Sequence, residues 1–157
     1  MTQQLTLRIV VEEPPSGVDF ALQKGKGSTY EPVQKQRSKG NDLIFEFQPV
    51  IRSGVSSHGL SLAGPFVQGP PRARFVYLDI GTYAGQCDSH WSRRLKIPLE
   101  GITAAMIAKG GVFEVRVPGT ARDGGPNCAT VKDFKGWRRV KALTRGGPGI
   151  RSLSGSD

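Results

Sequence analysis

Glycine and proline break this chain into short segments, and this constrains the fold more than any other feature. They supply 21 and 11 of the 157 residues, about a fifth of the chain against about 12% in average proteins. Both residue types interrupt regular helices and strand ladders. The chain therefore favours short strands joined by turns. It has no apolar run near the roughly 18 residues that a membrane-spanning helix needs, so we expect no membrane partner.

Between these breaks, apolar and polar residues mostly alternate, as they do in strands with one buried face. The predicted strands are residues 5–12, 18–23, 43–48, 74–80, 94–99, 112–117 and 128–131. One short helix is predicted over residues 104–109, because Thr103 can cap its start and Gly110 can end it. The pattern predicts a mainly β fold, a small antiparallel β-sandwich or barrel with one short helix.

The connections between the predicted strands differ in length. Residues 14–17 form a Pro-Pro-Ser-Gly turn, and the strands on either side of it are expected to pair as a hairpin. Residues 25–42 hold few apolar side chains and are interpreted as a mobile loop, much longer than the usual length of about 4–6 residues. Residues 128–131 are expected to be the last strand, and Trp137 can pack back against the body. We therefore expect one globular β-rich domain over residues 1–141 and a basic, Gly/Ser-rich disordered tail over residues 142–157.

The start of the chain is polar and has no basic segment of the kind that opens a secretory signal. We therefore expect a cytoplasmic protein. Its two cysteines, Cys87 and Cys128, are then reduced thiols, because disulfides persist in oxidising compartments. Neither belongs to a Cys-x-x-Cys pair of the kind that binds zinc or carries redox chemistry. We expect neither a cofactor nor a metal.

The most distinctive string is Gly-Pro-Phe-Val-Gln-Gly at residues 64–69, followed by Arg-Phe-Val-Tyr-Leu at residues 74–78. With the Arg-Arg-Leu-Lys-Ile segment at 93–97 and Asn-Cys-Ala at 127–129, it resembles a family of small uncharacterised bacterial proteins, one of the groups defined as domains of unknown function. The resemblance covers about residues 60–132. It implies a single compact domain, and it brings no activity and no catalytic residue.

The leading interpretation is a non-catalytic module that binds a small ligand or a protein partner. The two glycines and three prolines of residues 64–71 make that loop rigid, and its Gln68 can present an amide donor and acceptor at the mouth of a pocket. Basic and aromatic side chains lie nearby in the sequence. The predicted binding residues are Gln68, Arg72, Arg74, Tyr77, Trp91 and Arg93.

Two alternatives stay open. The net charge is +9, and residues 132–157 carry seven basic side chains but two acidic ones, so a polyanion such as nucleic acid is a second candidate partner. Its predicted contacts are Lys135, Arg138, Arg139, Lys141 and Arg145. The other alternative is an enzyme with a site near His58, His90 and Asp88, although their spacing matches no familiar catalytic or metal motif.

Overall fold

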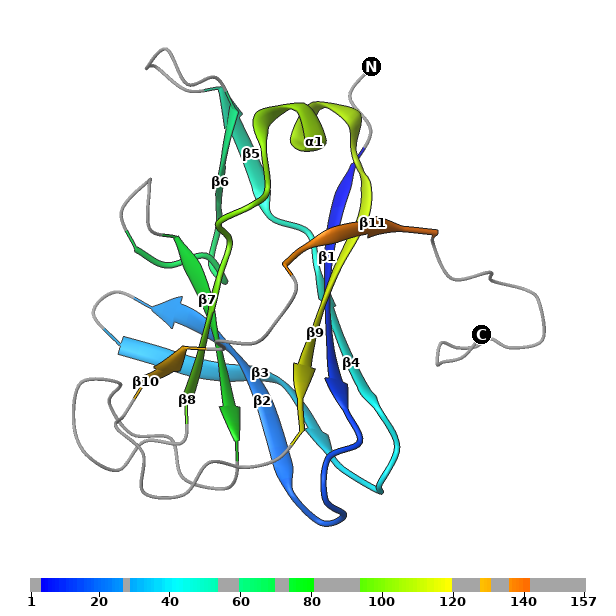
Figure 1. The fold of residues 1–157 in the computed structure, drawn as a ribbon. Helices are drawn as coiled ribbons and strands as arrows, with labels where there is room; N and C mark the ends of the chain where they lie inside the picture. Colours follow the sequence, from blue (N-terminus) through cyan, green and yellow to red (C-terminus); the bar gives the residue numbers. More distant parts are fainter. Residues whose placement is uncertain are drawn as a thin grey trace.

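The computed structural model describes residues 4–26, 29–53, 60–69, 74–80, 94–119, 128–130 and 136–141. Its strands form two main sheets and a two-stranded ribbon, arranged as a sandwich and not as one closed barrel (Figure 1). The first sheet has the order β11 (Arg138–Val140), β9 (Gly111–Pro118), β1 (Leu5–Glu12) and β4 (Leu43–Phe47). The second has the order β10 (Cys128–Thr130), β8 (Arg94–Pro98), β7 (Phe75–Ile80), β2 (Asp19–Lys26) and β3 (Thr29–Arg37). The ribbon pairs β5 (Val50–Ser53) with β6 (Leu60–Ala63). The prediction of a mainly β fold is confirmed.

The core lies between the inner faces of the two main sheets. On β1, Leu7, Ile9 and Val11 are fully buried, and on β7 so are Val76 and Leu78. Each of these side chains occupies every second position of its strand, because successive side chains of a strand point to opposite faces. Burying such a side chain stabilises the fold by roughly 1.5–3 kcal/mol. The alternation in the sequence therefore identifies the inner face correctly.

The predicted helix is confirmed as α1 (Ala104–Lys109). The Oγ1 atom of Thr103 accepts a hydrogen bond from the backbone N–H of Met106 at 3.2 Å, which satisfies one of the free donors of the first turn. Gly110, with a φ of 76°, ends the helix, and a positive φ of this kind favours glycine. Ile107 is buried and faces the core. Among the described residues, no helix is long and apolar enough to cross a membrane.

The expected hairpin between the first two strands is wrong. β1 and β2 lie in different sheets, and the Pro14–Gly17 turn carries the chain from one sheet to the other. Both edges of β1 are already occupied, one by β4 and the other by β9. β1 and β2 each have one apolar face. Packing these faces against each other across the core buries more apolar surface than pairing the two strands edge to edge would.

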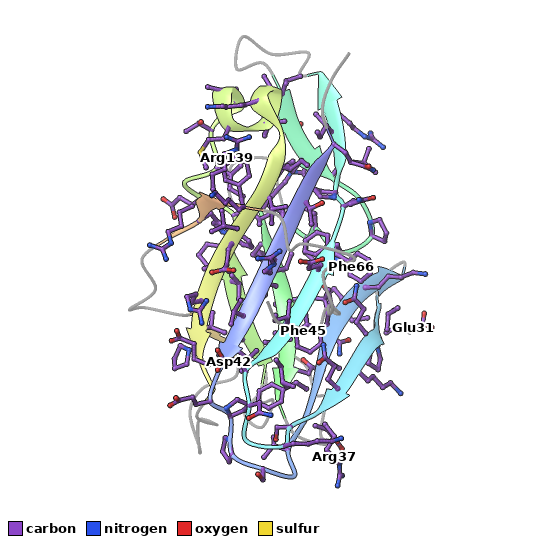
Figure 2. The ribbon with its side chains drawn as sticks, turned by 90° about the vertical axis from the view of Figure 1, so that its right-hand side faces the viewer. Glu31, Arg37, Asp42, Phe45, Phe66 and Arg139 are labelled. Carbon is purple, nitrogen blue, oxygen red and sulfur yellow. The ribbon has the colours of Figure 1, made fainter. Side chains whose placement is uncertain are left out.

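The interpretation of residues 25–42 as a loop is also wrong, because Thr29–Arg37 forms the strand β3. It pairs antiparallel with β2 and lies at the edge of the second sheet. Glu31 and Arg37 lie at the periphery of the molecule (Figure 2). The side-chain amides of Gln34 and Gln36 donate to the backbone carbonyls of Glu46 at 2.9 Å and Ile44 at 2.7 Å. These amides join β3 to β4, the edge strand of the opposite sheet, and cover a row of acceptors that would otherwise be exposed.

The last part of the chain adds to both sheets. β10 pairs parallel with β8, and β1 pairs parallel with β9, although the sequence favoured antiparallel pairing. β10 is not the last strand, because β11 follows it and pairs antiparallel with β9. The expected return of Trp137 to the body is confirmed. Its side chain is buried, and its Nε1–H donates to the carbonyl of Pro98 at 2.9 Å.

Candidate ligand-binding site

Successive side chains of β7 point to opposite faces of the second sheet, so neighbouring candidate residues lie on different faces. Val76 and Leu78 belong to the main core, whereas Phe75 and Tyr77 form a separate apolar cluster on the outer face. Arg74 comes directly before β7 and shares the side of Val76, whereas Tyr77 shares the outer face with Asp79. The sequence had grouped Arg74 and Tyr77 into one surface. The structure instead places them on two different sides of the sheet.

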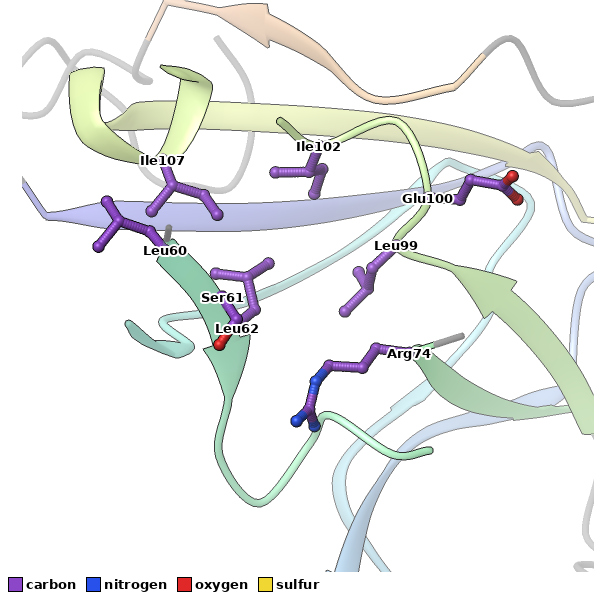
Figure 3. Close-up of a pocket in the computed structure, with 8 residues that line it drawn as sticks. All are labelled: Leu60, Ser61, Leu62, Arg74, Leu99, Glu100, Ile102 and Ile107. Atoms are coloured by element: carbon purple, nitrogen blue, oxygen red, sulfur yellow. The ribbon is translucent and has the colours of Figure 1, made fainter. Parts of the chain in front are cut away.

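On the inner side, Arg74 borders a cavity of about 200 Å³ (Figure 3). We call it the Arg74 cavity. Its walls come from β6, from the start of β7, from the segment between β8 and α1, and from α1 itself. The lining residues are Leu60, Ser61, Leu62, Arg74, Leu99, Glu100, Ile102 and Ile107. Five of the eight are leucine or isoleucine, and Ser61, Arg74 and Glu100 add polar groups, so the described lining combines aliphatic walls with a polar surface.

Backbone hydrogen bonds hold the walls of this cavity together. The N–H of Leu99 donates to the carbonyl of Arg74 at 2.9 Å, and the N–H of Ile102 donates to the carbonyl of Leu99 at 3.2 Å. The first bond fixes the start of β7 against the segment that leads to α1. The second forms the turn that brings Ile102 over the cavity. Arg74 is therefore presented from an anchored backbone, although its side chain is long.

The guanidinium of Arg74 is the unusual feature of the cavity. Its side chain runs from the start of β7 toward β6, near Ser61 and Leu62 (Figure 3). The Nε atom is buried and has no hydrogen-bond partner, and no ion pair is recorded between Arg74 and a carboxylate of the described residues. An arginine has five N–H donors and no acceptor, and a buried donor without a partner costs about 1–3 kcal/mol, more when it is charged. The site therefore supplies the positive charge of the guanidinium to an anion that enters, while the buried Nε is a donor without a partner.

Gln68 lies on the outer face of the second sheet, against β2. Its backbone exchanges two hydrogen bonds with Phe75, and its Nε2 donates to the carbonyl of Pro65 at 3.0 Å. The same carbonyl accepts from the N–H of Gly25 at 2.7 Å. A Cβ atom at Gly25 would lie 2.6 Å from Gln68 Nε2. The amide thus packs into the space that glycine leaves on β2, and this contact holds the 64–69 loop to the sheet.

A double-mutant cycle will measure this contact. Gly25→Ala is expected to lower the free energy of unfolding by about 1 kcal/mol, because the new methyl group displaces the Gln68 amide and breaks its hydrogen bond. In a Gln68→Ala background the same change should cost less than about 0.5 kcal/mol. Urea unfolding of the four proteins gives the coupling energy. Equal costs in both backgrounds would mean that Gln68 does not hold the loop through Gly25.

Tyr77 lies in the middle of an aromatic row that crosses the outer face. Its ring centroid is 5.1 Å from that of Tyr30 on β3 and 4.7 Å from that of Phe75. The Nζ atom of Lys96 lies 4.4 Å from the centroid of Phe75, a cation–π distance. Tyr77 itself is buried. The Tyr77 ring therefore packs against its aromatic neighbours, and Tyr30 is the exposed residue of the row.

The same face also holds a buried polar pair that the sequence pattern does not predict. The side-chain amide of Gln23 on β2 donates to Oδ2 of Asp79 on β7 at 2.7 Å, and both residues are buried. Asp79 interrupts an otherwise apolar strand, and this was the available signal. The aliphatic walls of the Arg74 cavity gave no comparable signal, because they come from segments far apart in the sequence.

Other predicted residues are exposed or lie outside the described part of the chain. Arg138, Arg139 and Lys141 are exposed on or next to β11, and Figure 2 shows Arg139 close to α1. Their role in binding a polyanion stays a prediction. The predicted residues outside the described ranges are Arg72, Trp91, Arg93, Lys135, Arg145, His58, His90, Asp88 and Cys87. Within the described ranges, no group of three or more His, Cys, Asp or Glu residues could hold a metal ion.

Comparison with known proteins gives a match to a protein family. The model of DUF5990, described as a family of unknown function, matches residues 5–140. The match includes the Arg74 cavity and both main sheets. No curated protein and no solved structure matches the chain.

Proposed function

Because the chain belongs to DUF5990, a family of unknown function, we propose a function from its own geometry: a non-catalytic binding module that takes a small organic anion in the Arg74 cavity. One observation carries this proposal. The guanidinium of Arg74, whose Nε has no hydrogen-bond partner, borders a cavity whose walls include five leucine and isoleucine side chains. Small-ligand sites are usually apolar hollows with a few polar groups that fix the orientation of the ligand.

The lining favours binding over catalysis. Among its eight residues, the groups able to act as a nucleophile or a base are the hydroxyl of Ser61 and the carboxylate of Glu100. Figure 3 shows the Glu100 carboxylate turned away from Ser61. An activated serine needs a base within hydrogen-bond reach. The arrangement therefore supports recognition of an anion and offers no pair of groups for its chemical conversion.

Replacing Arg74 by methionine tests the proposal. Methionine keeps an apolar stem but removes the cation, so the rise in melting temperature that an organic anion gives to the wild-type protein should disappear. Without ligand, Arg74→Met should melt at the same temperature or higher, because a buried donor without a partner is removed. Thermal unfolding followed by circular dichroism, with millimolar acetate, 4-methylpentanoate, benzoate or phosphate at constant ionic strength, makes both measurements.

Arg52→Met is the matched control, because Arg52 is an exposed arginine on β5 and does not line the cavity. Its response to each anion should equal that of the wild-type protein. The proposal fails if none of these anions stabilises the wild-type protein. It also fails if Arg74→Met responds to them as strongly as the wild-type protein does.

A further inference from the structure

The Arg74 cavity also points to a class of ligand. Resting on the proposed function, we infer that the ligand is an aliphatic monocarboxylate with about six carbon atoms, whose carboxylate pairs with Arg74 and whose chain fills the space among the leucines and isoleucines. Four properties of the cavity lead to this class: its charge, its volume, the chemistry of its walls and the orientation of Glu100.

The charge of the cavity favours a single negative charge. Among the lining residues that the structure describes, Arg74 is the one cation, and Glu100 adds an exposed carboxylate. A guanidinium has the fork geometry that pairs with both oxygens of a carboxylate. A phosphate dianion would leave one of its charges without a cation among the described lining residues. The site therefore matches a carboxylate better than a phosphate.

The volume limits the length of the ligand. An apolar cavity of about 150 Å³ in another protein is known to hold one benzene molecule, which has six carbon atoms. The Arg74 cavity of about 200 Å³ has room for a body of about this size together with a carboxylate. Acetate would leave most of the apolar wall in contact with water, and a much longer chain would extend beyond the cavity.

The walls select an aliphatic chain. Leu60, Leu62, Leu99, Ile102 and Ile107 supply branched aliphatic surface, and no aromatic ring is among the eight lining residues. Each methylene that moves from water into such surroundings adds about fourfold to the affinity. An aromatic acid would gain no edge-to-face or stacked contact here. Affinity should therefore rise steadily with chain length until the cavity is full.

The orientation of Glu100 argues against an amino acid as the ligand. An α-amino group next to the bound carboxylate would need an acceptor close to Arg74. Figure 3 shows the Glu100 carboxylate directed away from the Arg74 guanidinium. The ammonium would then lose water without gaining a partner. Leucine should bind more weakly than 4-methylpentanoate, which has the same branched chain and no amino group.

Ile107 is the residue that sets the preferred length. It reaches the cavity from α1, which is held in place by its cap at Thr103 and by Gly110. Replacing Ile107 by alanine removes part of one wall. The cavity then accommodates a longer chain, so the best ligand should become one or two carbons longer.

Isothermal titration calorimetry with unbranched acids from acetate to octanoate, together with 4-methylpentanoate, leucine, benzoate and phosphate, tests the inference. We expect wild-type affinity to rise about fourfold per carbon to a maximum near six carbons, and Ile107→Ala to move this maximum to a longer acid. Leu43→Ala is the matched control, because it truncates a buried side chain at the far end of β4 and should leave the maximum unchanged. Ile107→Val replaces Ile107→Ala if the latter does not fold.

The outcomes separate this inference from the proposed function. If phosphate, benzoate or leucine binds through Arg74 more tightly than the six-carbon acids, the cavity is an anion site and the ligand class inferred here is overturned. The same holds if affinity does not change with chain length, or if the Ile107 variant keeps the wild-type maximum. If no probe binds the wild-type protein, both the ligand class and the proposed function fail.

Discussion

Replacing Arg8 by methionine will lower the free energy of unfolding by about 3 kcal/mol, as expected when one partner of a buried ion pair is removed. Arg8 lies on the outer face of the first sheet and is 5% exposed. Its Nε is 2.7 Å from Oε2 of Glu46, and its Nη1 is 3.2 Å from Oε1 of Glu114. The register places both carboxylates directly opposite Arg8, one on β4 and one on β9. Without the guanidinium, Glu46 is left without its cation, whereas Glu114 keeps Arg116, whose Nη1 lies 3.0 Å from its Oε2.

Arg37→Met is the control for this prediction. Arg37 forms an equally close pair with Asp19, with Nε 2.9 Å from Oδ1, but both side chains are exposed. Exposed pairs contribute little because water and salt screen them, so this change should leave the free energy of unfolding nearly unchanged. Urea unfolding at neutral pH measures both variants. Similar small losses in the two would show that burial does not strengthen the Arg8 pairs.

A second pair of variants separates charge from packing at Arg8. Arg8→Lys keeps the charge but cannot reach two carboxylates with a planar fork, so its loss of stability should be intermediate. Adding Glu46→Gln to Arg8→Met removes the stranded carboxylate and should restore part of the loss. If the added change restores nothing, the loss in Arg8→Met does not come from the stranded Glu46 carboxylate.

Replacing Trp137 by alanine will cost about 3–5 kcal/mol, the usual range for the truncation of a buried tryptophan. The ring belongs to the main core, and its Nε1–H donates to Pro98 at the end of β8. Trp137 directly precedes β11, which pairs with β9 in the other sheet. The side chain therefore connects the two sheets at the point where the chain leaves the core.

Two further variants, Trp137→Phe and Arg138→Ala, serve as comparisons for Trp137→Ala. Phenylalanine keeps most of the apolar contact of Trp137 but loses its hydrogen bond. Trp137→Phe should therefore lower the free energy of unfolding by more than about 1 kcal/mol, but by clearly less than Trp137→Ala. Arg138 is exposed, and its truncation should stay within about 0.5 kcal/mol. Circular dichroism is the appropriate probe, because the change at position 137 removes one of the two tryptophans. A loss below 1 kcal/mol in Trp137→Ala would show that the ring does not stabilise the core.

The sequence predicts those elements whose pattern of apolar, capping and turn residues is complete within one short segment. The alternation of β1 and β9, the apolar run of β7 and the capped helix α1 each follow from residues within one short segment. The core positions Leu7, Ile9 and Val11 were predictable for the same reason, because a buried face repeats every second residue. The burial of Trp137 followed from its size and apolar character.

β3 shows where a local pattern fails. Its side chains are mostly polar, and an edge strand with one solvated face needs few apolar residues. The side chains of Gln34 and Gln36 donate to backbone carbonyls of β4. These contacts exist only after the two sheets have packed together, so the local sequence cannot predict them. The assignment of β1 and β2 to different sheets has the same origin, since pairing depends on which strand edges are already occupied.

The sequence by itself determined the β-rich class, the inner faces of the strands, the helix and the choice of Arg74 and Tyr77 as residues of interest. Only the tertiary structure decided that these two side chains lie on opposite faces of the second sheet, because successive side chains of a strand point to opposite faces. It alone also assembled the cavity, whose walls come from β6, the start of β7, the β8–α1 segment and α1. No periodicity within one segment can predict a cavity of this kind, because its volume and the unsatisfied Nε donor of Arg74 exist only after distant segments have packed together.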